Sequence, residues 1–277
     1  MKTILVSLDQ HSYSQAVLET ALILGRGFES YIEGFARGPD LHKLIAVEVP
    51  LAIPLSAEVP PQQMVESAHQ QFETFMRAHA VPEGVGEPNG LSFGWFGNAL
   101  QDASFLGDYG RAFDIVVVGR PGSDSDGPRM ASLEEALFES GRPVLVAPPI
   151  APKEMGQSIV IAWNGSTETA RATGFAMPLL LRAKRVVVLT VIGGTVPGPA
   201  GERIARSLRI NGVAAQALDV EPEGRPTGEV VLVNAQKLGA DLLVKGAYTQ
   251  SRMRQLIFGG ATRYLLDHVT LPMLMAH

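Results

Sequence analysis

Short apolar runs and amphipathic stretches alternate along the whole chain. Runs such as Thr3–Leu8, Asp114–Gly119 and Arg185–Val191 are rich in β-branched residues, which is typical of strands buried on both faces. Between such runs, stretches like Gln62–His79 carry apolar residues on related helical faces. Strands that alternate with helices predict βαβ units, right-handed crossovers and a mostly parallel sheet, so the expected fold class is α/β.

Three stretches have weaker patterns. Gly25 and Gly27 follow the apolar residues of the first predicted helix and predict its end near Leu24. Residues Ala99–Leu106 are expected to form a helix. Residues 37–61 are rich in proline and apolar residues without a sustained period, so we expect a loop that serves as a lid or as a flap on the domain surface.

The same order of elements occurs twice. A proline-bearing stretch interrupts the order, which restarts with a strand at Ser158–Trp163. Each part closes with a helix, a proline and a short apolar strand, first in SGRPVLVAPP and again in DHVTLPMLMAH. We therefore predict two domains, residues 1–149 and 156–277, joined by a linker at residues 150–155.

Composition narrows the class of protein. The chain is 46% hydrophobic and 18% charged with a net charge of -5, so it can bury real cores and does not have the basic balance of a nucleic-acid binder. It has no cysteine, which excludes disulfides, zinc–thiolate sites and cysteine nucleophiles, and its histidines show no metal-ligand spacing. Neither a membrane span nor a secretory signal is recognisable, so we expect a cytoplasmic protein.

One stretch has the pattern of a phosphate-binding loop. The apolar run Leu242–Val244 leads into Lys245 and Gly246, and a polar loop then reaches Gly259 and Gly260 before a helical pattern begins. Unpaired amides at a helix N-terminus attract anions, and glycines let the main chain approach them closely. The alternative is structural, with Gly246 ending a strand and the glycine pair forming a turn.

The chain resembles a tandem-domain universal stress protein of the UspA-like family. The resemblance rests on the strand-end acid or amide of each part, Asp9 and Asn164, on the loop after the fourth strand, and on the closing helix–proline–strand unit. It implies two doubly wound five-stranded sheets with strand order 3-2-1-4-5, flanked by helices, which pair through their last strands. The chain would then be an internally paired monomer or would form a homodimer.

The resemblance also implies a nucleotide site between the first and fourth strands of the second part. Nucleotide-binding members carry a glycine, two residues, a second glycine, nine residues, then a glycine and a small hydroxyl residue. Here Thr249 stands at the second glycine, Gly260 replaces the hydroxyl residue, and Asn164 replaces the usual ribose-binding aspartate. The residues that would bind the nucleotide are Asn164, Val191, Lys245, Gly246, Thr249, Gly259, Gly260 and Ala261.

The first part keeps other pieces of the same pattern. Gly119 and Gly122 match the opening glycine pair and Asp9 is retained, but Ser132 stands where the next glycine belongs. Two aspartates in the intervening loop would repel phosphate unless a cation such as Mg²⁺ accompanied the nucleotide. We therefore expect the second part to bind the nucleotide rather than the first.

The function expected from the resemblance is that of a stress-response regulator that binds ATP, ADP or AMP. No catalytic residue is predicted, because neither a partner nucleophile nor a general acid accompanies Asp9, and any ATP hydrolysis would be slow. Two alternatives stay open. One is a degenerate scaffold whose pockets are filled by side chains and which acts through protein partners, and the other is a lipid or small-molecule site built from residues 37–61.

Overall fold

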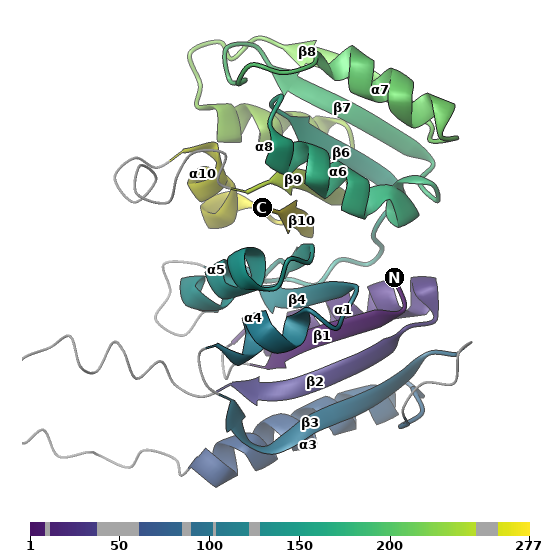
Figure 1. Ribbon diagram of the computed structural model, residues 1–277, viewed down its shortest axis with the longest axis vertical. Helices are drawn as coiled ribbons and strands as arrows, with labels where there is room; N and C mark the ends of the chain where they lie inside the picture. The colour runs from purple at the N-terminus through teal and green to yellow at the C-terminus, as the bar shows by residue number, and fades with distance from the viewer. Residues whose placement is uncertain (9–11, 38–60, 85–89, 102–103, 122–127, 248–259) are drawn as a thin grey trace, which may run out of the picture.

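The computed structural model describes residues 1–8, 12–37, 61–84, 90–101, 104–121, 128–247 and 260–277 (Figure 1). The expected lid or flap at residues 37–61 lies almost wholly outside these ranges. Four residues of the predicted site also lie outside them: Asp9, Gly122, Thr249 and Gly259.

All the named strands join one ten-stranded sheet, in the order β3-β2-β1-β4-β5-β10-β9-β6-β7-β8. We call β1 to β5 with their helices the first half, and β6 to β10 with theirs the second half. The strands of the first half are β1 (Thr3–Leu8), β2 (Tyr31–Arg37), β3 (Ser92–Gln101), β4 (Ile115–Gly119) and β5 (Val144–Ala147). Those of the second half are β6 (Ser158–Trp163), β7 (Arg185–Val191), β8 (Ala215–Val220), β9 (Leu242–Gly246) and β10 (Met273–Ala276).

Each half has the expected strand order, 3-2-1-4-5, with parallel pairing throughout. The two expected five-stranded sheets are joined edge to edge, because β5 and β10 pair in antiparallel fashion with Leu274 opposite Leu145. The α/β fold and the internal pairing of the last strands are thereby confirmed. The division into two domains at residues 150–155 stays a prediction.

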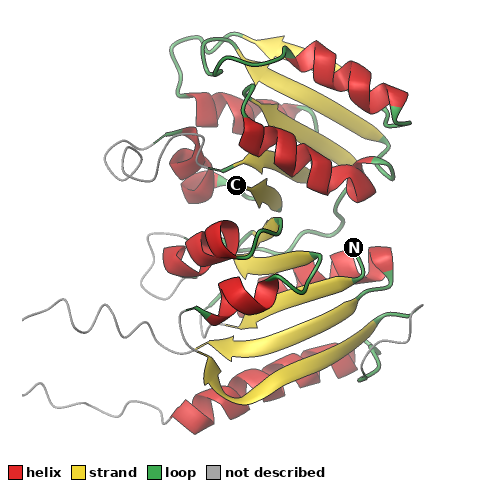
Figure 2. Ribbon diagram, viewed as in Figure 1, coloured by secondary structure: helices red, strands yellow, loops and turns green. Residues whose placement is uncertain are grey.

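Helices cover both faces of the sheet (Figure 2). One face packs against α1 (Ser14–Phe28), α3 (Pro61–Ala78), α6 (Thr167–Leu180) and α7 (Gly201–Ile210). The other packs against α4 (Phe105–Gly110), α5 (Met130–Glu139), α8 (Thr227–Lys237) and α10 (Ala261–His268). Because both faces are covered, the central strands are apolar throughout rather than alternating.

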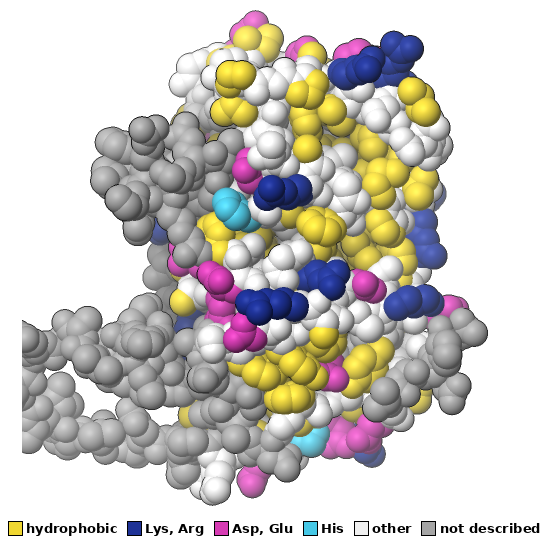
Figure 3. Space-filling model, in the orientation of Figure 1, with side chains coloured by type: hydrophobic (Ala, Val, Ile, Leu, Met, Phe, Trp, Pro, Cys, Tyr) yellow, Lys and Arg dark blue, Asp and Glu magenta, His cyan; other side chains and the backbone are white. Residues whose placement is uncertain are grey.

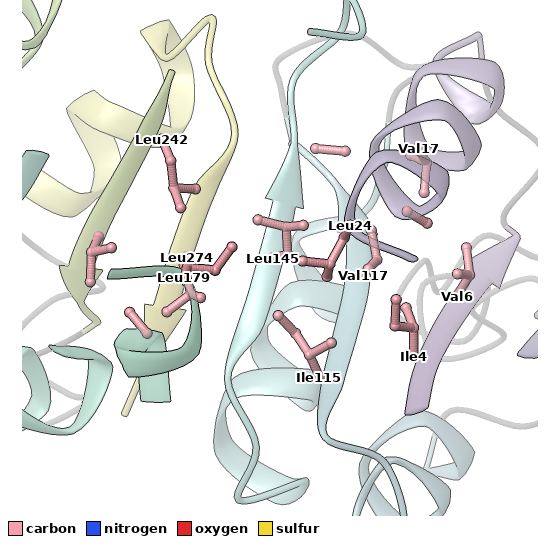
Figure 4. Packing of buried hydrophobic residues seen from close by; sticks show 14 of the residues in the cluster. Ile4, Val6, Val17, Leu24, Ile115, Val117, Leu145, Leu179, Leu242 and Leu274 are labelled. Atoms are coloured by element: carbon pink, nitrogen blue, oxygen red, sulfur yellow. The ribbon is translucent and has the colours of Figure 1, made fainter. Parts of the chain in front are cut away.

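The hydrophobic core continues across the junction of the two halves. Leu145 on β5 and Leu274 on β10 are fully buried and lie between the β4 side chains of the first half and Leu179 of α6 (Figure 4). Burying a leucine side chain stabilises a fold by about 1.5–3 kcal/mol. The shared core therefore couples the halves energetically as well as through backbone hydrogen bonds.

A carboxylate at the start of the fourth strand repeats in both halves. Asp114 accepts hydrogen bonds from the amides of Lys2 and Thr3, at 2.5 and 3.2 Å. Asp241 accepts three, from the amides of residues 156, 157 and 158, at 2.8, 2.9 and 3.2 Å. Each carboxylate thereby fixes the entry of the first strand of its half, a repeat that the apolar pattern alone did not reveal.

Two predicted boundaries are wrong. Helix α1 continues past Gly25 to Phe28. Gly25 serves the close packing of α1 on β2 rather than the end of the helix, because a Cβ at this position would lie 2.6 Å from Cδ1 of Ile32. The helix ends instead at Glu29, whose left-handed backbone has φ 53° and whose amide donates to Gly25.

The helix expected at Ala99–Leu106 is the second error. Strand β3 runs on to Gln101, which pairs with Arg37 after a register shift, and α4 begins only at Phe105. Pairing with the neighbouring strand decides the conformation here, and a short apolar stretch could not reveal it.

Candidate functional site

A narrow cavity lies at the carboxyl ends of β6, β7 and β9. Strand order reverses between β6 and β9, the position where open parallel sheets bind ligands. The cavity has a volume of about 50 Å³. Its lining includes four of the predicted site residues, Asn164, Val191, Lys245 and Ala261, so the fold brings together residues from four separate segments of the second half.

Lys245 is the most unusual side chain of the cavity. It is only 8% exposed, and its ammonium donates hydrogen bonds to the carbonyl oxygen of Gly246 at 2.8 Å and to Oγ1 of Thr262 at 2.7 Å. Neither acceptor is charged, and within the described part of the chain no carboxylate pairs with it. Burial lowers the pKa of Lys245 to about 8, because water no longer solvates the ammonium.

The N-terminus of α10 opens beside Lys245. Gly260 is its N-cap residue and has no side chain that could accept from the amides of the first turn. Ala261, the first residue of the helix, lines the cavity. A helix N-terminus and a buried ammonium both favour an anion. Here the two are adjacent, because the ammonium of Lys245 donates to the hydroxyl of Thr262, the second residue of α10.

Asn164 is engaged in the turn that starts α6. Its Oδ1 accepts from the hydroxyl of Thr169 at 2.6 Å and from the amide of Ser166 at 3.2 Å. Ser166 in turn caps α6 by accepting from the amide of Thr169 at 3.2 Å. The carboxamide oxygen that would contact a ribose hydroxyl is therefore held by its own loop, and the ribose role of Asn164 stays a prediction.

Gly246 allows β9 and α6 to approach closely. A Cβ at this position would lie 2.3 Å from the backbone nitrogen of Thr169 and 2.6 Å from the carbonyl carbon of Glu168. In contrast, a Cβ at Gly260 would meet none of the described residues within 4 Å. The structure thus gives the first glycine of the predicted loop a packing role, whereas the described residues give Gly260 no such role.

A loop that the sequence analysis did not predict contributes Gly194 to the lining of the cavity. Residues 192–200 follow β7, and the amide of Val196 donates to the carbonyl of Asn164 at 2.9 Å. Gly165, with φ 84°, and Gly198 allow the contact, since a Cβ at Gly198 would lie 2.2 Å from the carbonyl oxygen of Gly165. The glycines and prolines of VIGGTVPGPAG are the sequence signal that indicates this loop.

The first-half residues of the predicted site are described only in part. Gly119 ends β4, where a Cβ would lie 2.4 Å from the side chain of Pro128. Ser132 is 2% exposed and lies within α5. Because Asp9 and Gly122 lie outside the described residues, the expectation that the second half rather than this one binds the nucleotide stays a prediction.

The described residues give little support to a metal site, a membrane-spanning helix or a continuous basic surface. They contain no group of three or more His, Cys, Asp and Glu residues that could hold a metal ion. None of their helices combines the length and the apolar character that crossing a membrane requires. On the face drawn in Figure 3, basic side chains are interspersed with acidic ones and do not form one continuous basic surface.

Comparisons with known proteins give matches to universal stress proteins. The model of the Universal stress protein family matches residues 155–277. A universal stress protein of Synechocystis is 24% identical over 166 residues, which cover 58% of this chain and 57% of that relative, so the match spans little more than half of the relative's length.

Solved structures resemble the whole chain. The universal stress protein from Archaeoglobus fulgidus has a TM-score of 0.69 at 13% identity, covering 99% of this chain and 95% of that one. A functionally unknown protein from Pseudomonas aeruginosa has a TM-score of 0.58 at 13% identity, covering 100% and 92%. At such identities the likeness concerns the fold alone.

Proposed function

Because the chain is a UspA-like universal stress protein, we propose that its second half binds an adenine nucleotide and that the protein acts as a stress-response regulator. The phosphates would lie over the N-terminus of α10 beside Lys245, the ribose near Asn164 and the adenine near Val191. The observation that carries the proposal is the buried ammonium of Lys245, which has only neutral acceptors in the described part of the chain. Burying a charge is costly unless an opposite charge accompanies it, so the site favours an anionic ligand.

The volume of the cavity favours a second candidate function. Ligand pockets usually enclose about 300–1,000 Å³, whereas this cavity has about 50 Å³. A nucleotide would need the cavity to widen, and the contact between Val196 and Asn164 is the hydrogen bond that would have to open. If it does not open, the protein is a scaffold that keeps the family's fold without its ligand and acts through protein partners.

Calorimetry separates the two candidates. We expect the full chain to release or absorb heat on titration with ATP, ADP or AMP, each with and without Mg²⁺. Replacing Lys245 by methionine should weaken binding about 10- to 100-fold, the equivalent of roughly 1.5–3 kcal/mol for one charged hydrogen bond. Lys184→Met is the matched control, because Lys184 is exposed and precedes β7 at the opposite edge of the sheet.

Each outcome decides between the candidates. No heat with any nucleotide at millimolar concentration would favour the scaffold. Heat that is unchanged in Lys245→Met would place the nucleotide elsewhere in the chain.

A further inference from the structure

We propose that the amine of Lys245 is a reactive site for carbon dioxide, which adds to it as a carbamate. This inference does not depend on nucleotide binding. It rests on three features of the described residues: the size and lining of the cavity, the hydrogen bonds of the amine, and the groups that would receive the product's negative charge.

The cavity suits a small uncharged molecule. The volume of about 50 Å³ exceeds the roughly 10–15 Å³ that a cavity needs in order to hold one water molecule, and it is well below the roughly 300 Å³ at which ligand pockets usually begin. Much of the lining is aliphatic, including Ala162, Leu189 and Leu265, which are all at least nine-tenths buried. A linear triatomic molecule without charge can enter such a space without the desolvation cost that an ion would meet.

The hydrogen bonds of Lys245 match a neutral amine. A neutral amine has two N–H groups, and the described residues supply two acceptors, the carbonyl oxygen of Gly246 and the hydroxyl of Thr262. An ammonium has a third N–H group, for which the described residues supply no acceptor. With both N–H groups of the neutral form bonded, its lone pair remains available for reaction.

The protonation equilibrium favours the reactive form. Burial lowers the pKa of Lys245 to about 8, so about a quarter of the molecules carry the neutral amine at pH 7.5. An ordinary exposed lysine, with a pKa near 10.4, is neutral in only about one molecule in a thousand at that pH. Lys245 is therefore about two hundred times richer in the form that reacts.

The reaction is an addition without oxidation or reduction. The nitrogen lone pair attacks the carbon of CO2 and forms an N–C bond, while one C=O π pair moves onto oxygen. One N–H proton then leaves to water, and the product is an N-carboxylate with one negative charge. Ala261 at the N-terminus of α10 and the hydroxyl-bearing Thr227 line the same cavity and can stabilise that carboxylate.

Carbamate formation reverses the charge of the site. The side chain changes from a cation to an anion at the position where the proposed function places a phosphate. If that function holds, CO2 and nucleotide compete, and CO2 becomes a regulator of nucleotide binding. If it fails, the carbamate chemistry is unaffected.

The test uses the full chain equilibrated with ¹³C-labelled CO2 and bicarbonate between pH 7 and 8.5, without nucleotide. Carbamates are recorded by ¹³C NMR, then trapped with a trialkyloxonium reagent and located by peptide mass spectrometry. We expect trapped adduct at Lys245, at least tenfold above that at Lys184, with occupancy rising with pH at fixed CO2. The peptide map separates an adduct at Lys245 from one at the terminal α-amine.

Variants and outcomes complete the test. Lys245→Met should lose the part of the NMR signal that the peptide map assigns to Lys245, and Lys184→Met should keep it, with folding of both checked by circular dichroism. Absence of adduct at Lys245, or equal adduct at Lys184, overturns the proposal. If Lys245→Met does not fold, the peptide map of the unaltered chain alone decides. Carbamate without nucleotide heat would remove the proposed function and keep this inference, and nucleotide heat without carbamate would do the reverse.

Discussion

Replacing Gly246 by alanine is expected to lower the free energy of unfolding by about 3 kcal/mol, an overpacking cost. The added Cβ would lie 2.3 Å from the backbone nitrogen of Thr169 and 2.6 Å from the carbonyl carbon of Glu168, in the first turn of α6. A flexible side chain could rotate away from such a contact, but a helix backbone must shift as a unit. The shift would also disturb the hydrogen bonds that Asn164 makes to this turn.

Gly260→Ala is the matched control for this prediction. Gly260 has φ -76°, which any residue adopts, and a Cβ there would meet none of the described residues within 4 Å. Because alanine is a poorer N-cap residue than glycine, we expect a loss of at most about 1 kcal/mol. Urea unfolding with unchanged slope gives both values. Equal stability of the two variants would contradict the packing role of Gly246.

The second large effect concerns pH. Lys245 has its pKa lowered from 10.5 to about 8 by burial, so the folded chain releases this proton before the unfolded chain does. Between these two values the unfolded state binds more protons, and the free energy of unfolding therefore rises with pH. Below pH 8 both states are protonated, and the fold carries the full cost of the buried charge, roughly 3 kcal/mol.

Comparison with Lys245→Met isolates this contribution. The variant loses the titrating group and leaves the acceptors at Gly246 and Thr262 unbonded, so its stability at a single pH mixes several effects. Those effects do not titrate. We expect the stability of the unaltered chain, minus that of the variant, to increase by roughly 2–3 kcal/mol between pH 7 and 10.

Urea unfolding at each pH measures this difference, under CO2-free gas so that carbamate cannot form. Lys184→Met, at an exposed position, should show no comparable trend. A difference that stays flat with pH would mean that Lys245 is solvated in the folded protein. The buried ammonium on which the nucleotide proposal rests would then not exist.

The candidate site shows which features a local sequence pattern can predict and which it cannot. The sequence places Lys245 and Gly246 correctly at the end of β9, and Ala261 correctly at the start of α10. It could not show that Lys245 is bonded to Thr262, or that Gly246 faces the first turn of α6. The same glycine fits a phosphate loop and a crowded helix–strand contact, and only the neighbouring backbone distinguishes them.

The sequence by itself determined the α/β class, the repeat and nearly all of the strands, because runs buried on both faces must be apolar and helices must carry an apolar stripe. Those signals lie within a few residues of each other along the chain. Only the tertiary structure decided that the two halves share one sheet, that Asn164 is bonded within its own loop and that residues 192–200 narrow the cavity. The shared sheet and the narrowed cavity depend on contacts between segments tens of residues or more apart. The bonding of Asn164 depends on the side-chain geometry of its turn. Neither kind of contact leaves a periodic trace in the sequence.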